Sequence, residues 1–407
     1  MFSTIRSGFT RLILAALSLA LASDISIAGP KAYVGNFKDN TVSVIDTDAG
    51  TVVATVPVAA GPHGMAVTSD GRLLYVSGDG SSMLDVIDIA TNRVTRTIEV
   101  GMAPNGLALA PDGRLLLVAV NGTDRIAFVD TATQAVTSSV AVPKPHTVSI
   151  RPDGKVAYVT SQEPGHFALS VIDLDGRSVL RTITLDKTPR DLEFGHDGRA
   201  AYFTEAGVNA VEVLDPASDR IVAQIQTGVS PHYVNFFRGT RFGMTVVQGP
   251  GELLLFDPAI DTPVRAIKVG KQPHWAAVFV DGRTAYVTNE GSNDVSVVNL
   301  ASGTATTIAV GNAPRKVVVQ PAAGGPRVSI ANFAFVPKVL TIAAGDRVTC
   351  SNDDGAPHQI GFKDGASGSD TLFPGKTYSR TFDKPGSYEY FCTIHNYMTG
   401  RIVVRSR

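Results

Sequence analysis

The feature that most constrains the fold is a repeat of about forty residues that fills the first three quarters of the chain. Turns of the Asp-Gly type place glycines at positions 71, 113, 154, 198 and 282, and Arg238-Gly239 fills the one gap. The Gly-to-Gly steps are 42, 41, 44, 41 and 43 residues. Strand-like runs such as LLYVSG, VAYVTS and TAYVTN follow these turns. Four short strands at this period are typical of a β-propeller blade, whose small twisted sheet buries its faces against its neighbours.

The number of blades follows from a second recurring segment, a proline-containing loop before the innermost strand. It occurs seven times, as AGPHG, MAPNG, PKPHT, KTPRD, VSPHY, KQPHW and NAPRK. The first strand, KAYVGN, lacks an inner strand before it, and the last inner strand, KVVVQP, has no followers. We expect the two ends to close one composite blade, because that pairing removes free sheet edges. The sequence therefore predicts an all-β chain with a seven-bladed propeller over residues 29–320.

The repeated strands resemble a known family. AYVGN, LYVSG, AYVTS and AYVTN, together with the Asp-Gly turns, are similar to the YVTN family of seven-bladed β-propellers over about residues 31–320. The resemblance implies the fold and leaves the function open, because propellers support unrelated activities.

One position in the repeat carries half of the histidines in the chain, four of eight. It follows the loop proline, at the entry to the innermost strand, so its side chains are expected to surround one mouth of the central channel. We call this set the channel ring, and its members are His63, Asn105, His146, Arg190, His232, His274 and Arg315. Imidazoles are common copper and zinc ligands, and guanidinium groups bind anions. The ring is therefore either a second metal or anionic-substrate site, formed by its histidines and arginines, or the polar lining of a wet channel.

The C-terminal residues have an independent pattern. PAAGGPR, from residue 321, is a composition break that predicts a linker over 321–326. Alternation in VSIANFAF and LTIAAGDRVT then predicts a β-sandwich over residues 327–407. FCTIHNYMTG places Cys392, His395 and Met398 at three-residue intervals, and His358 lies 34 residues before the cysteine. One thiolate, two imidazoles and one thioether are the ligand set of a type 1 (blue) copper centre.

The same residues resemble the cupredoxins, in particular amicyanin, pseudoazurin and plastocyanin. The matching segments are GDRVT, NDDGAPHQI, FPGKTYSRTF, GSYEYFC and CTIHNYM, within about residues 327–405. The resemblance implies a Greek-key sandwich that binds one copper ion through His358, Cys392, His395 and Met398, with His395 as the imidazole through which electrons pass. The sequence departs from the family at Gln359, where Asn is frequent, and at Cys350, where Trp is frequent.

The two cysteines, Cys350 and Cys392, also allow a disulfide. Cys350 ends a strand-like segment and is typical of a small buried residue. A disulfide would consume the thiolate that a copper ion requires. The copper-ligand interpretation of Cys392 is therefore favoured over the disulfide.

The N-terminus predicts export. Two arginines precede the apolar run LILAALSLALA, which is too short for a stable membrane span and is typical of a signal peptide, expected over residues 1–28. An uncleaved anchor is the alternative. The mature protein is then periplasmic or otherwise exported, with no further membrane span. The 37 acidic and 36 basic residues nearly cancel, which argues against nucleic acid as a partner.

Two functions are compatible with these features. The first is an exported type 1 copper electron-transfer protein whose propeller is a docking or substrate module for a redox partner. The second is a copper-dependent oxidoreductase whose channel ring holds a second metal or a small anionic substrate. A homodimer, which would bring a cupredoxin domain over a neighbouring ring, is compatible with both.

Overall fold

The structure is a computed structural model that describes residues 30–236, 242–279, 281–321 and 326–405. The expected signal peptide, the Arg238-Gly239 turn and residues 322–325 of the expected linker lie outside the described residues. Within the described ranges the chain consists of β-strands, and the one helical element is the 3-10 turn η1 (Asn121–Thr123). None of the helices in these ranges is long and apolar enough to cross a membrane.

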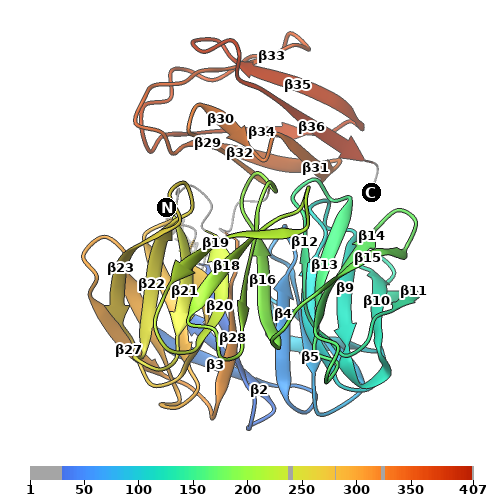
Figure 1. Ribbon diagram of the computed structural model, residues 1–407. Helices are drawn as coiled ribbons and strands as arrows, with labels where there is room; N and C mark the ends of the chain where they lie inside the picture. The colour runs from blue at the N-terminus through green and yellow to red at the C-terminus, as the bar shows by residue number, and fades with distance from the viewer. Residues whose placement is uncertain (1–29, 237–241, 280, 322–325, 406–407) are drawn as a thin grey trace, which may run out of the picture.

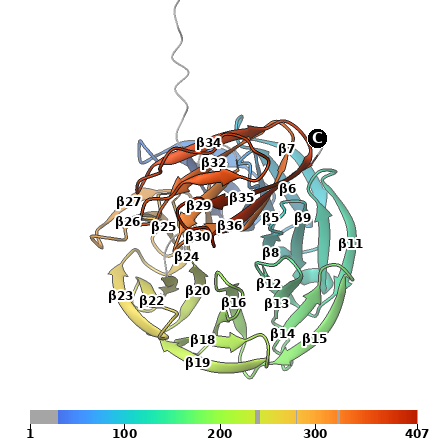
Figure 2. The ribbon, with the colours of Figure 1, turned by 90° about the horizontal axis from the view of Figure 1, so that it is seen from above.

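Seven four-stranded antiparallel sheets in the described part of the chain form a ring around a central channel (Figures 1 and 2). The first blade contains β4 (Pro62–Val67), β5 (Leu73–Gly78), β6 (Met83–Asp88) and β7 (Arg93–Glu99). The second contains β8 (Pro104–Leu109), β9 (Leu115–Val120), β10 (Arg125–Asp130) and β11 (Ala135–Ala141). The third contains β12 (Pro145–Ile150), β13 (Val156–Ser161), β14 (Ala168–Asp173) and β15 (Ser178–Thr184).

The fourth blade contains β16 (Pro189–Phe194), β17 (Ala201–Glu205), β18 (Ala210–Asp215) and β19 (Arg220–Gln226). The fifth contains β20 (Pro231–Phe236), β21 (Gly243–Val247), β22 (Glu252–Asp257) and β23 (Thr262–Lys268). The sixth contains β24 (Pro273–Val278), β25 (Thr284–Asn289), β26 (Asp294–Asn299) and β27 (Ala305–Ala309). This arrangement confirms the predicted propeller.

Burial explains why the two central strands of each blade are the most apolar. The central strand β9, LLLVAV, is buried at every residue but its first. Both faces of such a strand pack against neighbouring blades, so its sequence is almost continuously hydrophobic. The outer strand β7, RVTRTIE, is mostly exposed and carries charged side chains.

The seventh blade closes the ring, as the sequence predicts. It combines β28 (Pro314–Val319) with β1 (Lys31–Asn36), β2 (Thr41–Asp46) and β3 (Thr51–Pro57). β28 pairs antiparallel with β1, with Ala32 opposite Val319 and Val34 opposite Val317. The two ends of the repeat region are thereby held together by a backbone ladder.

The C-terminal strands form a separate β-sandwich of two four-stranded sheets, which confirms the cupredoxin fold class. One sheet contains β30 (Ala334–Val336), β29 (Arg327–Ala331), β32 (Asp346–Asn352) and β34 (Thr377–Phe382). The other contains β31 (Val339–Ala343), β36 (Thr399–Arg405), β35 (Gly386–Cys392) and β33 (Ile360–Phe362). Cys392 and Met398 belong to the buried core between the sheets.

The sandwich lies over the propeller face that bears the Asp-Gly turns (Figures 1 and 2). A cavity of ≈ 640 Å³ in the channel is lined both by turn residues, such as Pro111 and Pro152, and by the sandwich residues Phe335–Lys338. We call it the channel cavity. The innermost strands begin at the channel ring and end near these turns. The channel ring therefore lies at the end of the channel remote from the sandwich.

The composite blade gives a stability prediction. Val317 on β28 is fully buried, so Val317→Ala should destabilise the propeller by about 2 kcal/mol through lost burial and a residual cavity. Trp275, the only tryptophan, lies in the propeller, so urea unfolding followed by tryptophan fluorescence reports this domain. Val222→Ala, on the exposed part of β19, is the control. It should lower the free energy of unfolding by about 0.5 kcal/mol or less. Equal decreases in the free energy of unfolding for the two variants would contradict the prediction.

Candidate metal centre

Two loops of the sandwich bring the predicted copper ligands together. Cys392 is the last residue of β35, and His395 and Met398 lie in the loop that leads to β36. A tight turn holds this loop, because the Met398 N–H donates to the His395 carbonyl (2.9 Å) and the Cys392 N–H donates to the Met398 carbonyl (3.0 Å). His358 comes from the loop before β33, which is anchored by a bridge to Leu372.

Three donor atoms face one another at this point. Cys392 Sγ lies 3.6 Å from His358 Nδ1 and 3.7 Å from His395 Nδ1, and the two nitrogens are 3.3 Å apart. A point equidistant from all three atoms lies roughly 2 Å from each, close to the ~2.0–2.3 Å bonds that imidazole and thiolate make to zinc. The triangle therefore has room for one transition-metal ion.

His358 is oriented by a carboxylate. Its Nε2–H donates to Asp354 (2.9 Å), which leaves Nδ1 as the free acceptor on the side of Cys392 and His395. Burial lowers the pKa of His358, and the Asp354 carboxylate partly opposes this effect. A neutral ring with a fixed tautomer is the form that ligates a metal, and an outer carboxylate of this kind increases the basicity of the ligand.

Cys392 and Met398 are enclosed, with exposed fractions of 0% and 2%. The backbone N–H of His395 donates a hydrogen bond to Cys392 Sγ (3.4 Å). Cys350, 3% exposed on β32, is a free cysteine, as is Cys392, and burial raises the pKa of the Cys350 thiol to about 12. The structure thus contains no disulfide between these two described residues.

The two ligand loops are joined by Gln359, the residue that departs from the family. Thr393 Oγ donates to the Gln359 side-chain carbonyl (2.7 Å), and the Thr393 N–H donates to its backbone carbonyl (2.8 Å). The sequence pattern alone does not reveal the roles of Thr393 and Asp354. Asp354 lies within the segment NDDGAPHQI, four residues before His358, and that short spacing next to a predicted ligand was the available signal.

An apolar rim surrounds the accessible edge of the site. His395 is half-buried, and Phe333 packs edge-on against both His358 and His395 (ring centroids 5.5 and 5.0 Å). We call three exposed residues at this edge the apolar rim: Phe333, Ile394 and Tyr397, with exposed fractions of 43%, 47% and 68%. Clustered aromatic side chains of this kind are typical of protein interaction sites.

The donor set fits copper. One thiolate and two imidazoles in a trigonal arrangement, with a weak axial thioether, are the ligands of blue copper electron-transfer sites, and the buried Met398 belongs to the same loop as His395. The soft sulfur donors favour copper over hard oxygen-preferring cations such as Mg²⁺. His358, Cys392 and His395 also form the one group of three metal-ligand residues with mutually close donor atoms that is found among the described residues.

The channel ring also gathers its histidines, although less tightly. His232 Nε2 and His274 Nε2 are 3.1 Å apart, and Glu290 lies 3.9 Å from His274. His63 packs edge-on against His146 and His274, with ring centroids 5.3 and 6.3 Å apart. The remaining ring members make other contacts: Asn105 donates to Asp79, Arg190 to Ser230, and Arg315 pairs with Glu290 over the Phe37 ring.

Burial determines the charge of these imidazoles. It lowers the pKa of His63, His146 and His274, and lowers that of His232 to about 3, with nearby arginines adding to the effect. The four rings are therefore neutral near pH 7. Nδ1 of His63 and Nδ1 of His274 are buried without a hydrogen-bond partner, which is unusual for buried polar atoms.

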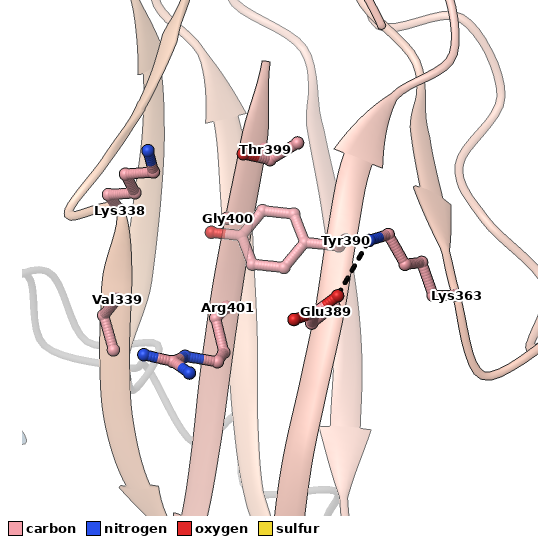
Figure 3. A pocket seen from close by; sticks show the side chains of 8 residues that line it. All are labelled: Lys338, Val339, Lys363, Glu389, Tyr390, Thr399, Gly400 and Arg401. Carbon is pink, nitrogen blue, oxygen red and sulfur yellow. Dashed lines mark hydrogen bonds and ion pairs between the residues drawn. The ribbon is translucent and has the colours of Figure 1, made fainter. Parts of the chain in front are cut away.

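A smaller pocket of ≈ 230 Å³ lies on the outer sheet of the sandwich (Figure 3). Lys363 and Glu389 form an ion pair at 2.8 Å on one side of it, and Lys338 and Arg401 lie on the other side. None of the predicted copper ligands lines this pocket. It is a charged surface depression separate from the candidate metal centre.

Comparisons with known proteins agree with this geometry. Residues 325–405 match the family of copper binding proteins described as plastocyanin/azurin, and residues 27–112 match the YNCE-like beta-propeller family. Amicyanin-alpha of Methylorubrum extorquens is 36% identical over 26% of this chain and 92% of its own length. Amicyanin of Paracoccus versutus is 35% identical over 19% of this chain and 62% of its own length.

A comparison of structures supports the propeller fold. Hydrazine synthase of Kuenenia stuttgartiensis matches 66% of this chain and 91% of the matched chain, with a TM-score of 0.61 and 22% identity. At that identity the similarity shows the fold alone.

The Asp354–His358 hydrogen bond gives a prediction for metal affinity. Asp354→Ala should weaken copper binding by about 10–100-fold, because the imidazole loses the partner that fixes its tautomer and orientation. Asp353→Ala is the matched control, since Asp353 bonds to serines and to no predicted ligand. Competition titration with a copper chelator measures both affinities. An unchanged affinity in Asp354→Ala would show that this bond does not support the site.

Proposed function

Because residues 325–405 belong to the plastocyanin/azurin family of copper binding proteins, we propose that this protein is an exported type 1 copper electron-transfer protein. The observation that carries the proposal is the triangle of donor atoms from His358, Cys392 and His395, all within 3.7 Å of one another. Met398 would supply the weak axial sulfur. Bound copper would supply one-electron chemistry by alternating between two oxidation states.

The chain's own residues support this role by keeping the ligands in place. Asp354 fixes His358, Gln359 fixes the second ligand loop through Thr393, and the His395 N–H faces the cysteine sulfur. A ligand set held by hydrogen bonds outside it changes little when the charge of the site changes. Little reorganisation is the physical requirement for rapid electron transfer.

The exposed edge of His395 and the apolar rim around it are the proposed contact surface for a redox protein partner. The rim residues are exposed in the full chain, so the propeller leaves this surface free. Electrons would then pass through the His395 imidazole to or from a separate protein. The propeller would serve as a docking or substrate module, and export rests on the signal-like segment at residues 1–28.

The two cysteines allow a matched test of the copper proposal. Copper(II) added to the protein should produce an intense visible absorption with one copper per chain, because a thiolate–copper bond gives such a band. Cys392→Ser should lose this absorption. Cys350→Ser should keep it, since Cys350 is a buried residue outside the donor triangle. An absorption that persists in Cys392→Ser would overturn the proposed role of Cys392.

A second candidate function is a copper-dependent oxidoreductase with a second metal, or an anionic substrate, in the channel ring. The observation in its favour is the 3.1 Å separation of His232 Nε2 and His274 Nε2, together with the unpartnered Nδ1 atoms of His63 and His274. Neutral imidazoles bind a metal without first losing a proton. Arg190 and Arg315 would hold an anion beside it.

Metal analysis separates the two functions. If the ring binds a metal, the full chain should hold more than one ion after copper reconstitution, and His232→Ala with His274→Ala should lose the additional ion while the visible absorption remains. His196→Ala, at an exposed turn on the other propeller face, is the control. One copper per chain in all variants would support the electron-transfer protein alone.

A further inference from the structure

The channel cavity contains a cluster of charged side chains that neither proposed function uses. Its walls include the aromatic residues Phe194, Phe236 and Trp275, and residues Phe335–Lys338 of the sandwich line its upper side. Three of its side chains carry charge on innermost strands: Asp191 and Glu193 on β16, and Lys316 on β28. A concave cavity with aromatic walls and a few convergent polar groups is the usual form of a small-molecule site.

Lys316 is the exceptional residue of this cluster. Its Nζ lies 3.1 Å from the centroid of the Trp275 ring, which itself stacks on Tyr233 with centroids 3.6 Å apart. Among the described residues, this amino group has no hydrogen-bond partner. The amine therefore lines a cavity large enough for a small organic molecule and contacts the face of the Trp275 ring.

Two carboxyl groups accompany the amine. Asp191 accepts a hydrogen bond from the Val234 N–H (3.0 Å), and Glu193 accepts one from the Ser149 hydroxyl (3.1 Å). Burial raises the pKa of both, that of Glu193 to about 7. Burial also lowers the pKa of Lys316, and the two carboxylates partly oppose this. A neutral amine and a protonated carboxyl group are thus both accessible near neutral pH.

We propose that Lys316 is a carbonyl-binding residue, which forms an imine with a small aldehyde or ketone that enters the channel cavity. The neutral lysine nitrogen adds to the carbonyl carbon, and one proton moves from that nitrogen to the carbonyl oxygen to give a carbinolamine. Water then leaves as the C=N bond forms, with Glu193 as the proton donor to the departing hydroxyl. No oxidant or reductant is consumed in these steps. Lysines with perturbed ionisation in desolvated sites are the ones that use this chemistry.

The surroundings stabilise the product as well as the free lysine. A protonated imine keeps the positive charge over the Trp275 face and beside the two carboxylates, so the charge balance of the cavity is preserved. The aromatic side chains make part of the cavity wall apolar, and apolar surroundings disfavour the attack of water on the imine. The metal-binding loops of the sandwich are not required for this reaction, so it is independent of the copper proposal.

Reductive trapping tests the proposal. The full-length, copper-loaded protein is treated with acetaldehyde and sodium cyanoborohydride, and peptide mass mapping locates the ethylated lysines. We expect Lys316 to be modified at least about tenfold faster than the other lysines, and Trp275 fluorescence to change in parallel. Modification spread evenly over surface lysines, or concentrated elsewhere than Lys316, would overturn the proposal.

Two lysine variants test whether the Lys316 amine itself is the group that reacts with the aldehyde. Lys316→Met should remove the fast modification, and Lys338→Met, which changes the other lysine lining the same cavity, should retain it. The visible copper absorption reports the folded sandwich in each variant. If Lys316→Met does not fold, the modified position in the unaltered protein still decides the question. Glu193→Gln should slow trapping without changing the site of modification.

The pH dependence provides a further readout. Trapping should accelerate as Lys316 loses its proton and slow once Glu193 is deprotonated above about pH 7, which gives a bell-shaped profile. In Glu193→Gln the decline on the alkaline side should disappear. A profile that rises steadily to high pH, as for surface lysines, would contradict the proposal. The other ionisable groups lining the cavity are Asp191 on β16, His63 on β4, His274 on β24, His196 in the turn after β16, and Lys338 of the sandwich.

Discussion

The pairing of β28 with β1 is the interaction on which the propeller depends. Each blade buries its central strands only because a neighbour covers each face, so an open ring would expose two blade faces and a free edge. The Ala32–Val319 and Val34–Val317 pairs join residues almost three hundred positions apart. Closure also creates the channel, because only a complete ring brings Lys316 on the last inner strand opposite Asp191 and Glu193 on β16.

The candidate metal centre is built on a different principle. Its donor atoms come from two loops, and loops alone would not hold three atoms within 3.7 Å. Hydrogen bonds outside the donor set supply the precision: Asp354 to His358, Thr393 to Gln359 and the turn between His395 and Met398. The sandwich core beneath buries the cysteine and methionine. Ligands held by these hydrogen bonds and one partly exposed imidazole edge agree with the proposed electron-transfer role.

The sequence revealed the elements that repeat or have rigid spacing, and missed those that depend on contacts between distant segments. The blade count, the composite blade and the near approach of His358 to Cys392 and His395 follow from periodicity and ligand chemistry. Asp354 and Thr393 lie inside quoted motifs, yet their roles depend on side-chain directions that spacing does not report. The position of Lys316 could not be predicted, because nothing in NAPRKVVV distinguishes this lysine from others. Its contact with the Trp275 ring forms only when the ring of blades closes.

The hairpin that joins β29 to β30 touches two sites at once. Phe333 packs against both imidazoles of the metal centre, and two residues later Phe335 begins the segment that lines the channel cavity. This hairpin therefore forms part of the surroundings of the candidate metal centre and part of the wall of the channel cavity. Because Phe333 and Phe335 belong to one hairpin, a shift of this hairpin would change both the packing around the two imidazoles and the wall of the channel cavity.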